Sequence, residues 1–117
     1  MSNKKISKDE AFHKHKHGID LWVYPEINEH AELAHIQVQS GHFEEFYDKV
    51  STFTYYIIEG QGTFFLDEKP YQVVAGDFLS IPPNTKIYYL GKMKMVLVTT
   101  PPWKAENEVH VRDIPQT

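Results

Sequence analysis

The stretch Tyr55-Tyr56-Ile57-Ile58-Glu59-Gly60-Gln61-Gly62-Thr63 decides the fold prediction. It joins aromatic and β-branched residues, which favour strands, to two glycines, which are typical of a turn. A second stretch, Ala75-Gly76-Asp77-Phe78-Leu79-Ser80-Ile81-Pro82-Pro83-Asn84, again sets a short apolar run between turn residues. Together the two stretches predict successive short strands of an all-β protein.

The rest of the chain also alternates short runs that favour strands with residues that favour turns. Residues 34–38 alternate apolar and polar side chains, which predicts a strand with one dry face. Residues 59–62 are expected to form a turn between strands over 52–58 and 63–66, and residues 67–70 a hairpin turn. Separate strands are also expected over 86–90 and 95–100. About nine or ten strands in so short a chain must close into a barrel or sandwich to hide their edges.

Composition narrows the class of protein. A chain of 117 residues is the size of one domain, and its formal net charge of −4 argues against binding to nucleic acid. It has no apolar run of about 18 residues that could cross a membrane, and no cysteine for a disulfide or a thiolate metal site. The polar, lysine-rich residues 1–18 are expected to form a tail and residues 19–117 a single domain. Because the start has no apolar core of a signal peptide, a cytoplasmic location is expected.

The two stretches resemble the cupin family. The first is similar to the central hairpin of cupins, and the second to the beginning of the second cupin motif, at the expected separation. The resemblance covers residues 36–100. It implies an RmlC-like antiparallel β-barrel, a jelly roll or double-stranded β-helix. It also implies a homodimer, since cupins commonly pair through edge strands, and a free edge expected over residues 19–24 gives a physical reason for pairing.

The resemblance also locates the usual metal ligands of the family, and none is kept. Aligned on the motif glycines, the two ligand histidines fall on Tyr47 and Lys49, and the ligand glutamate on Phe53. The last ligand histidine falls on Ile87. Phenyl and aliphatic side chains cannot donate to a metal, and an ammonium group repels a cation. We therefore expect no metal and no other cofactor at this site.

The inward direction that the resemblance implies for Tyr47 and Lys49 predicts the rest of the lining, because residues two apart in a strand share a face. The predicted ligand-binding side chains are Glu45, Phe53, Tyr55, Ile57, Ile87 and Tyr89. Aromatic walls with few polar groups are typical of a small-molecule pocket. A fully packed interior is the alternative, and a slip of one residue in register would turn Tyr47 and Lys49 outward.

Two histidine patterns lie outside this lining. His42 and Glu44 share a face near the expected mouth of the barrel, and such a pair serves as a general acid–base or as part of a non-standard metal site. A solvated loop is the alternative. His13, His15 and His17 share a face if their segment is extended, a spacing that chelates transition metals, although the intervening lysines favour a tail.

Three functions stay open. The first is a metal-independent protein that binds a small polar metabolite or a sugar-like ligand. The second is a metal-free isomerase, epimerase or lyase acting on a carbohydrate-like substrate, with Tyr47, Lys49 or His42 moving protons and Glu45 orienting them. The third is a metalloenzyme whose ligands have relocated to residues among His35, His42, Glu44 and Glu45. A packed barrel that serves only in assembly is a further possibility.

Overall fold

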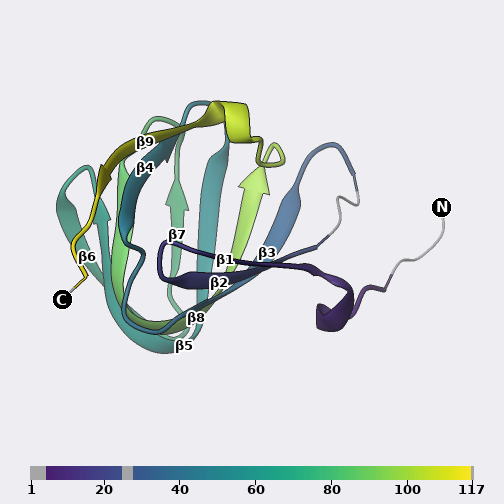
Figure 1. Cartoon of the computed structure of the whole chain (residues 1–117), viewed down its shortest axis with the longest axis horizontal. Coiled ribbons are helices and arrows are strands. Elements are labelled where there is room, and N and C mark those ends of the chain that lie inside the picture. Colours follow the sequence, from purple (N-terminus) through teal and green to yellow (C-terminus); the bar gives the residue numbers. More distant parts are fainter. Residues whose placement is uncertain (1–4, 25–27, 117) are drawn as a thin grey trace.

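The computed structural model describes residues 5–24 and 28–116, which form a curled sheet of nine strands (Figure 1). Its elements in chain order are η1 (Lys8–Glu10), β1 (Phe12–Lys16), β2 (Ile19–Val23), β3 (Glu32–Val38), β4 (Glu44–Asp48), β5 (Thr52–Leu66), β6 (Lys69–Val74), β7 (Phe78–Ile81), β8 (Ile87–Thr100), η2 (Ala105–Asn107) and β9 (Glu108–Asp113). The pairing order is β1-β2-β3-β8-β4-β9, and β5 pairs with β6, β7 and β8. All these pairs are antiparallel, so the predicted all-β cupin-like barrel is confirmed.

Strands β5 and β8 are the longest pair in the barrel, and they pair over the whole length of β5. The turn expected over residues 59–62 is wrong, because β5 continues through Gly60 with a φ of +89° and a register shift just before it. The glycines instead allow β5 and β8 to approach closely. A Cβ added at Gly60 would lie 2.1 Å from the main-chain oxygen of Lys92, and one at Gly62 would lie 2.5 Å from that of Leu90.

The segment expected to be a tail is an ordered arm. Strand β1 pairs with β2, from Phe12 opposite Val23 to Lys16 opposite Ile19, and the two strands cross one side of the barrel in Figure 1. Residues 1–4 of the expected tail lie outside the described residues. Because β1 pairs with β2, the edge expected over residues 19–24 is not free. A free edge at this strand is therefore no longer a reason to expect a homodimer. The homodimer itself stays a prediction.

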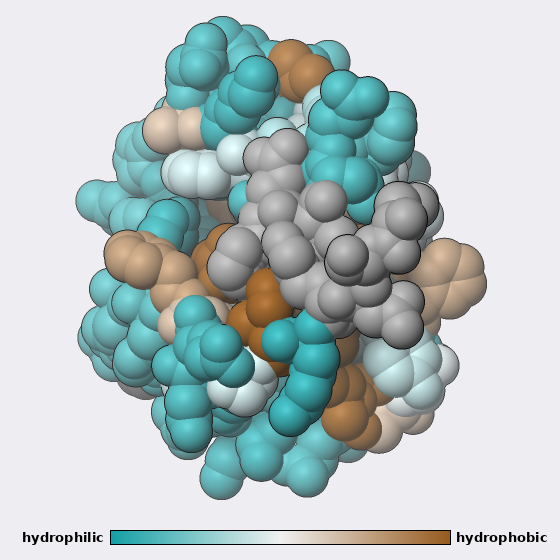
Figure 2. Space-filling model, turned by 90° about the vertical axis from the view of Figure 1, so that its right-hand side faces the viewer, coloured by the Kyte–Doolittle hydropathy of each residue, from teal (hydrophilic) through white to brown (hydrophobic). Residues whose placement is uncertain are grey.

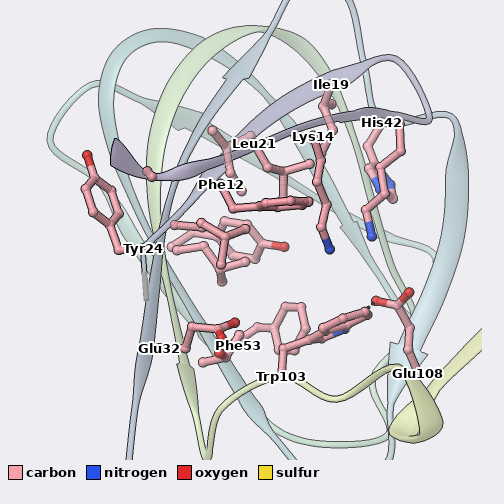
Figure 3. A pocket seen from close by; sticks show the side chains of 18 of the residues that line it. Phe12, Lys14, Ile19, Leu21, Tyr24, Glu32, His42, Phe53, Trp103 and Glu108 are labelled. Carbon is pink, nitrogen blue, oxygen red and sulfur yellow. Dashed lines mark hydrogen bonds between the residues drawn. The ribbon is translucent and has the colours of Figure 1, made fainter. Parts of the chain in front are cut away.

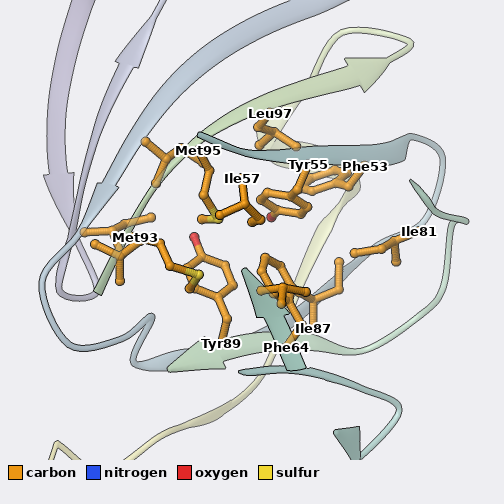
Figure 4. Close-up of a cluster of buried hydrophobic side chains, with 14 of the residues drawn as sticks. Phe53, Tyr55, Ile57, Phe64, Ile81, Ile87, Tyr89, Met93, Met95 and Leu97 are labelled. Atoms are coloured by element: carbon orange, nitrogen blue, oxygen red, sulfur yellow. The ribbon is translucent and has the colours of Figure 1, made fainter. Parts of the chain in front are cut away.

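The packed core occupies one part of the barrel interior (Figure 4). Large side chains from β5 and β8 meet there, and the most buried include Tyr55, Ile57, Phe64, Tyr89 and Met95, each at most 1% exposed. Burying each such side chain contributes about 1.5–3 kcal/mol. None of the helices among the described residues has the length and apolar character that a membrane span requires.

Candidate active site

A cavity of about 550 Å³ lies between the N-terminal arm and the barrel walls (Figure 3). Its inner wall is aromatic, with Phe46, Phe53, Tyr55 and Tyr89 from three different strands. Apolar side chains also gather near the centre of the face seen in Figure 2, among hydrophilic ones. A cavity of this size, with apolar walls and a few polar groups, has the general design of a small-molecule site.

His42 is the buried titratable base of this cavity. It is 4% exposed, and its ring stacks on Tyr89 with centroids 5.1 Å apart. Its Nδ1 donates a hydrogen bond to the main-chain oxygen of Glu44 at 2.7 Å, so the proton of the neutral ring lies on Nδ1. Among the described residues Nε2 has no hydrogen-bond partner. Burial, aided by electrostatic repulsion from Lys16, lowers the pKa of His42 to about 3. At neutral pH the ring therefore offers a bare Nε2 as acceptor or base.

Two phenol groups share this inner wall. Burial raises the pKa of both Tyr55 and Tyr89 above their usual range, so both hydroxyls stay protonated and can donate. Within the described part of the chain neither hydroxyl has a hydrogen-bond partner. Neither oxygen belongs to the fully buried side-chain atoms that lack a partner, so both hydroxyls reach the cavity. A bound molecule with suitably placed acceptors could take a hydrogen bond from each.

Charged groups lie on two sides of the cavity, with lysines on the arm and a carboxylate at the start of β9. The Nζ atoms of Lys14 and Lys16 are 5.0 and 5.2 Å from the centroid of the Trp103 ring, within the range of cation–π attraction. The indole Nε1 in turn donates to Oε1 of Glu108 at 3.1 Å. These residues add two cations, a carboxylate and a flat ring to the cavity lining.

The structure brings only part of the predicted site together. The predicted residues that line the cavity are His42, Phe53, Tyr55 and Tyr89. Ile57 and Ile87 point into the packed core instead, where each is at most 2% exposed. These two side chains support the cavity wall from behind and do not line it.

The predicted direction of β4 is wrong. Glu44 and Phe46 line the cavity, whereas Tyr47 does not line it and Lys49 is exposed just after the strand ends. Alternation along β4 is unbroken, because the register shift in its pairing with β9 skips Val111 of β9 and no residue of β4. Because side chains alternate in a strand, an error of one residue in register exchanges the two faces. The inward direction from which catalysis by Tyr47 and Lys49 was predicted is therefore absent in the structure.

The side chains considered as relocated metal ligands do not converge. His42 bonds the main-chain oxygen of Glu44 rather than its carboxylate, and Glu45 accepts a hydrogen bond from Nε of Arg112 at 2.8 Å without lining the cavity. His35 packs against an indole ring on β2. Within residues 5–24 and 28–116, no three His, Cys, Asp or Glu side chains are placed to hold a metal ion.

The sequence-based set of site residues did not include Lys14, Lys16, Trp103 or Glu108. A signal for the lysines was present, because they alternate with the three histidines and must share a face if the segment is a strand. In the structure the lysine face is the one that lines the cavity. Trp103 and Glu108 lie around η2, where no local pattern indicates that the chain folds back to the cavity.

The chain is similar to solved structures of one small β-barrel protein. Pac13, described as a unique nucleoside dehydratase, is 39% identical, with a TM-score of 0.94 over 97% of this chain and 95% of that chain. Structures of Streptomyces PAC13 with uridine include the variants H42Q, Y55F and Y89F, at 38–39% identity and the same TM-score, over 97–98% of this chain and 95% of theirs. The residues substituted in these variants have the same types and numbers as His42, Tyr55 and Tyr89 of this chain.

Three further comparisons bear on the fold and the family. An RmlC-like cupin from Shewanella frigidimarina, 15% identical, has a TM-score of 0.72 over 90% of this chain and 96% of its own, and shares the fold. An uncharacterized protein of Methanocaldococcus jannaschii is 39% identical over 57 residues, 45% of this chain; the match spans less than half, 46%, of that relative's length. The family model described as the cupin domain matches residues 32–99, which is more than half of the chain. The chain therefore belongs to the cupin family.

Proposed function

We propose that this protein is a nucleoside dehydratase that binds a uridine-like nucleoside in the cavity. The observation that carries the proposal is the placement of His42, Tyr55 and Tyr89 on one cavity wall, with a bare imidazole nitrogen and two unpartnered phenol groups. The same three residue types and numbers are substituted in the uridine-bound structures of the Streptomyces protein. A nucleoside carries a ribose, so this proposal narrows the sugar-like ligand expected from the sequence.

The site holds the groups that loss of water from a sugar requires. Nε2 of His42 removes a proton from carbon, a C–O bond breaks, and the double bond forms as hydroxide leaves. The imidazolium then returns its proton to the leaving oxygen, so the products are an unsaturated nucleoside and water. An imidazole with a pKa of about 3 is a weak base but, once protonated, a strong acid. The proton that it removes must therefore be acidified by a neighbouring electron-withdrawing group, such as a carbonyl on the sugar.

Other groups of the lining have clear parts in such a reaction. The phenols of Tyr55 and Tyr89 donate hydrogen bonds to oxygens of the substrate, because both stay protonated. Trp103 offers a flat face for the nucleobase, and Lys14, Lys16 and Glu108 can bond its polar edge. Dehydratases are lyases, so the proposal takes up the metal-free lyase considered from the sequence, with His42 rather than Tyr47 or Lys49 moving the proton.

The test compares the wild type with His42→Gln. We expect uridine to bind both proteins in calorimetry, because glutamine keeps a polar side chain of similar reach. Turnover of uridine derivatives that carry a carbonyl on the sugar, followed as loss of water by mass spectrometry, should fall about 100-fold or more in the variant. Tyr47→Phe and Lys49→Met are matched controls outside the lining and should keep wild-type turnover.

Two results would overturn the proposal. The first is that uridine at millimolar concentration does not bind the wild type and does not raise its melting temperature, which would show that nucleosides are not the ligands. Alternatively, the wild type could dehydrate a nucleoside and His42→Gln could do so at the same rate, which would remove His42 from the chemistry.

A further inference from the structure

Glu44 is the point at which three separate segments of the chain meet beside His42. Its side chain is only 9% exposed, and each carboxylate oxygen faces a histidine. Oε1 lies 3.2 Å from Nε2 of His17, in the turn between β1 and β2, and Oε2 lies 2.8 Å from Nδ1 of His110 on β9. A carboxylate this buried needs such partners, because an unpaired buried charge is costly.

The main chain of the same residue holds the imidazole of His42, through the 2.7 Å hydrogen bond from Nδ1 to its carbonyl oxygen. The residue between them, Phe43, is tied on both sides. Its N–H donates to the carbonyl oxygen of His17 at 2.7 Å, and its own oxygen accepts from the N–H of Ile114 at 2.9 Å. A displacement of Glu44 would therefore move the acceptor that decides which ring nitrogen of His42 carries the proton.

The carboxylate of Glu44 is not part of a proton relay with His42. The imidazole bonds the main-chain oxygen, whereas the carboxylate is turned toward His17 and His110. The ring of His17 also packs edge-on against that of His42, with centroids 5.6 Å apart. These contacts leave the carboxylate a role in geometry rather than in proton transfer.

We propose that Glu44, clamped by His17 and His110, is a positioning residue that holds His42 in the tautomer with a bare Nε2 toward the cavity. Its effect on turnover rests on the proposed function, whereas its effect on the tautomer does not. Through these contacts with Glu44, the N-terminal arm and β9 both help to position His42, although neither segment contains it.

The experiment compares Glu44→Ala, His110→Ala and His110→Gln in the full chain, by NMR of the imidazole nitrogens and by turnover. In the wild type we expect one His42 signal set with Nδ1 protonated. Both alanine variants should add signals of the tautomer protonated on Nε2, and kcat should fall about tenfold with KM changed less than about twofold. His110→Gln should keep the wild-type signals, because its amide can still donate to Glu44.

His30→Ala is the control for loss of a histidine, because the His30 side chain is 81% exposed and its one polar contact among the described residues is with Glu29. The hydrogen bond to Asn28 comes from the main-chain N–H of His30, which alanine keeps. The proposal is overturned if His42 keeps one tautomer in both alanine variants while their amide spectra show a folded barrel. It is also overturned if Glu44→Ala weakens uridine binding with unchanged His42 signals, since Glu44 would then be a ligand contact. Failure of the proposed function would give a different result. Neither the wild type nor any variant would turn over the nucleoside, but the His42 signals would still change in the alanine variants.

Discussion

The rings of Tyr55 and Tyr89, from the paired strands β5 and β8, meet edge to face with centroids 5.9 Å apart in the inner wall of the cavity. Both side chains are 1% exposed, yet neither hydroxyl bonds another described residue. This arrangement combines the packing of a core with the donors of a binding site. It explains why these two residues contribute to both the fold and the proposed function.

Removing either hydroxyl should separate these two contributions. We expect Tyr55→Phe and Tyr89→Phe to leave the free energy of unfolding unchanged or raise it by up to about 1 kcal/mol, because each removes a hydroxyl that makes no hydrogen bond to another described residue. The dissociation constant for uridine should rise about 5- to 30-fold. Chemical denaturation and calorimetry measure the two quantities. A loss of more than about 1 kcal/mol of stability would show that the hydroxyls already have partners in the free protein.

Stability should fall as the pH is lowered, because His42 is buried as a neutral ring. Its pKa is about 3 in the folded protein and near its ordinary 6.5 in the unfolded chain, so between these values the unfolded chain binds more protons. This group alone should cost about 2 kcal/mol of stability between pH 7 and pH 5.

The matched protein for this test is His42→Gln, which lacks the titrating ring. Urea denaturation at both pH values should show a smaller loss of stability in the variant than in the wild type. The effect of His110 on the pH dependence of stability has the opposite sign. Its hydrogen bond to Glu44 raises its pKa, so it contributes stability that is lost as the pH rises. An equal pH dependence in the two proteins would mean that His42 is not buried as described.

The close crossing of β5 and β8 predicts a large cost for a side chain at Gly60. Gly60→Ala should lose about 2–4 kcal/mol of unfolding free energy, because the added carbon meets a main-chain oxygen and the φ is positive. Gly76→Ala is the matched control, with a φ of +97° but no atom within 4 Å of the added carbon. It should lose only about 1 kcal/mol. Equal losses in urea denaturation would contradict the steric account.

The contacts of Trp103 with Lys14 and Lys16 should hold the arm against the barrel. Trp103→Leu removes two cation–π contacts, each worth about 0.5–1 kcal/mol, so the amides of β1 should exchange with solvent about tenfold faster. Hydrogen exchange of the arm, read by mass spectrometry, measures this. Phe78→Leu changes an exposed aromatic side chain on β7, away from the arm, and should leave β1 unaffected. Unchanged exchange in Trp103→Leu would show that backbone pairing alone holds β1.

Local patterns in the sequence predicted much of this protein. The turn between β5 and β6 lies at Asp67 and Glu68, with φ values of 49° and 71°, within the hairpin turn expected there. The motif positions predicted the cupin barrel, which the family match confirms. Alternation along β5 placed Phe53 and Tyr55 in the cavity wall, because side chains two apart in an undistorted strand share a face.

What only the tertiary structure decided depends on contacts between distant segments. Phe46 rather than Tyr47 faces inward, and the face that β4 turns to the cavity is set by its pairing with β8 and with β9 at the far end of the chain. Residues 12–16 are polar apart from Phe12 and carry no hydrophobic pattern of a strand, yet they pair with β2 and bring Lys14 and Lys16 to the cavity. The sequence by itself thus determined the all-β fold, the hairpin turn over residues 67–70 and the replacement of the family's metal ligands, but not the continuous strands β5 and β8 or the strand β1. The identity of the residues around His42 was decided only when the barrel closed, because strand register and the return of the chain ends are set by long-range packing.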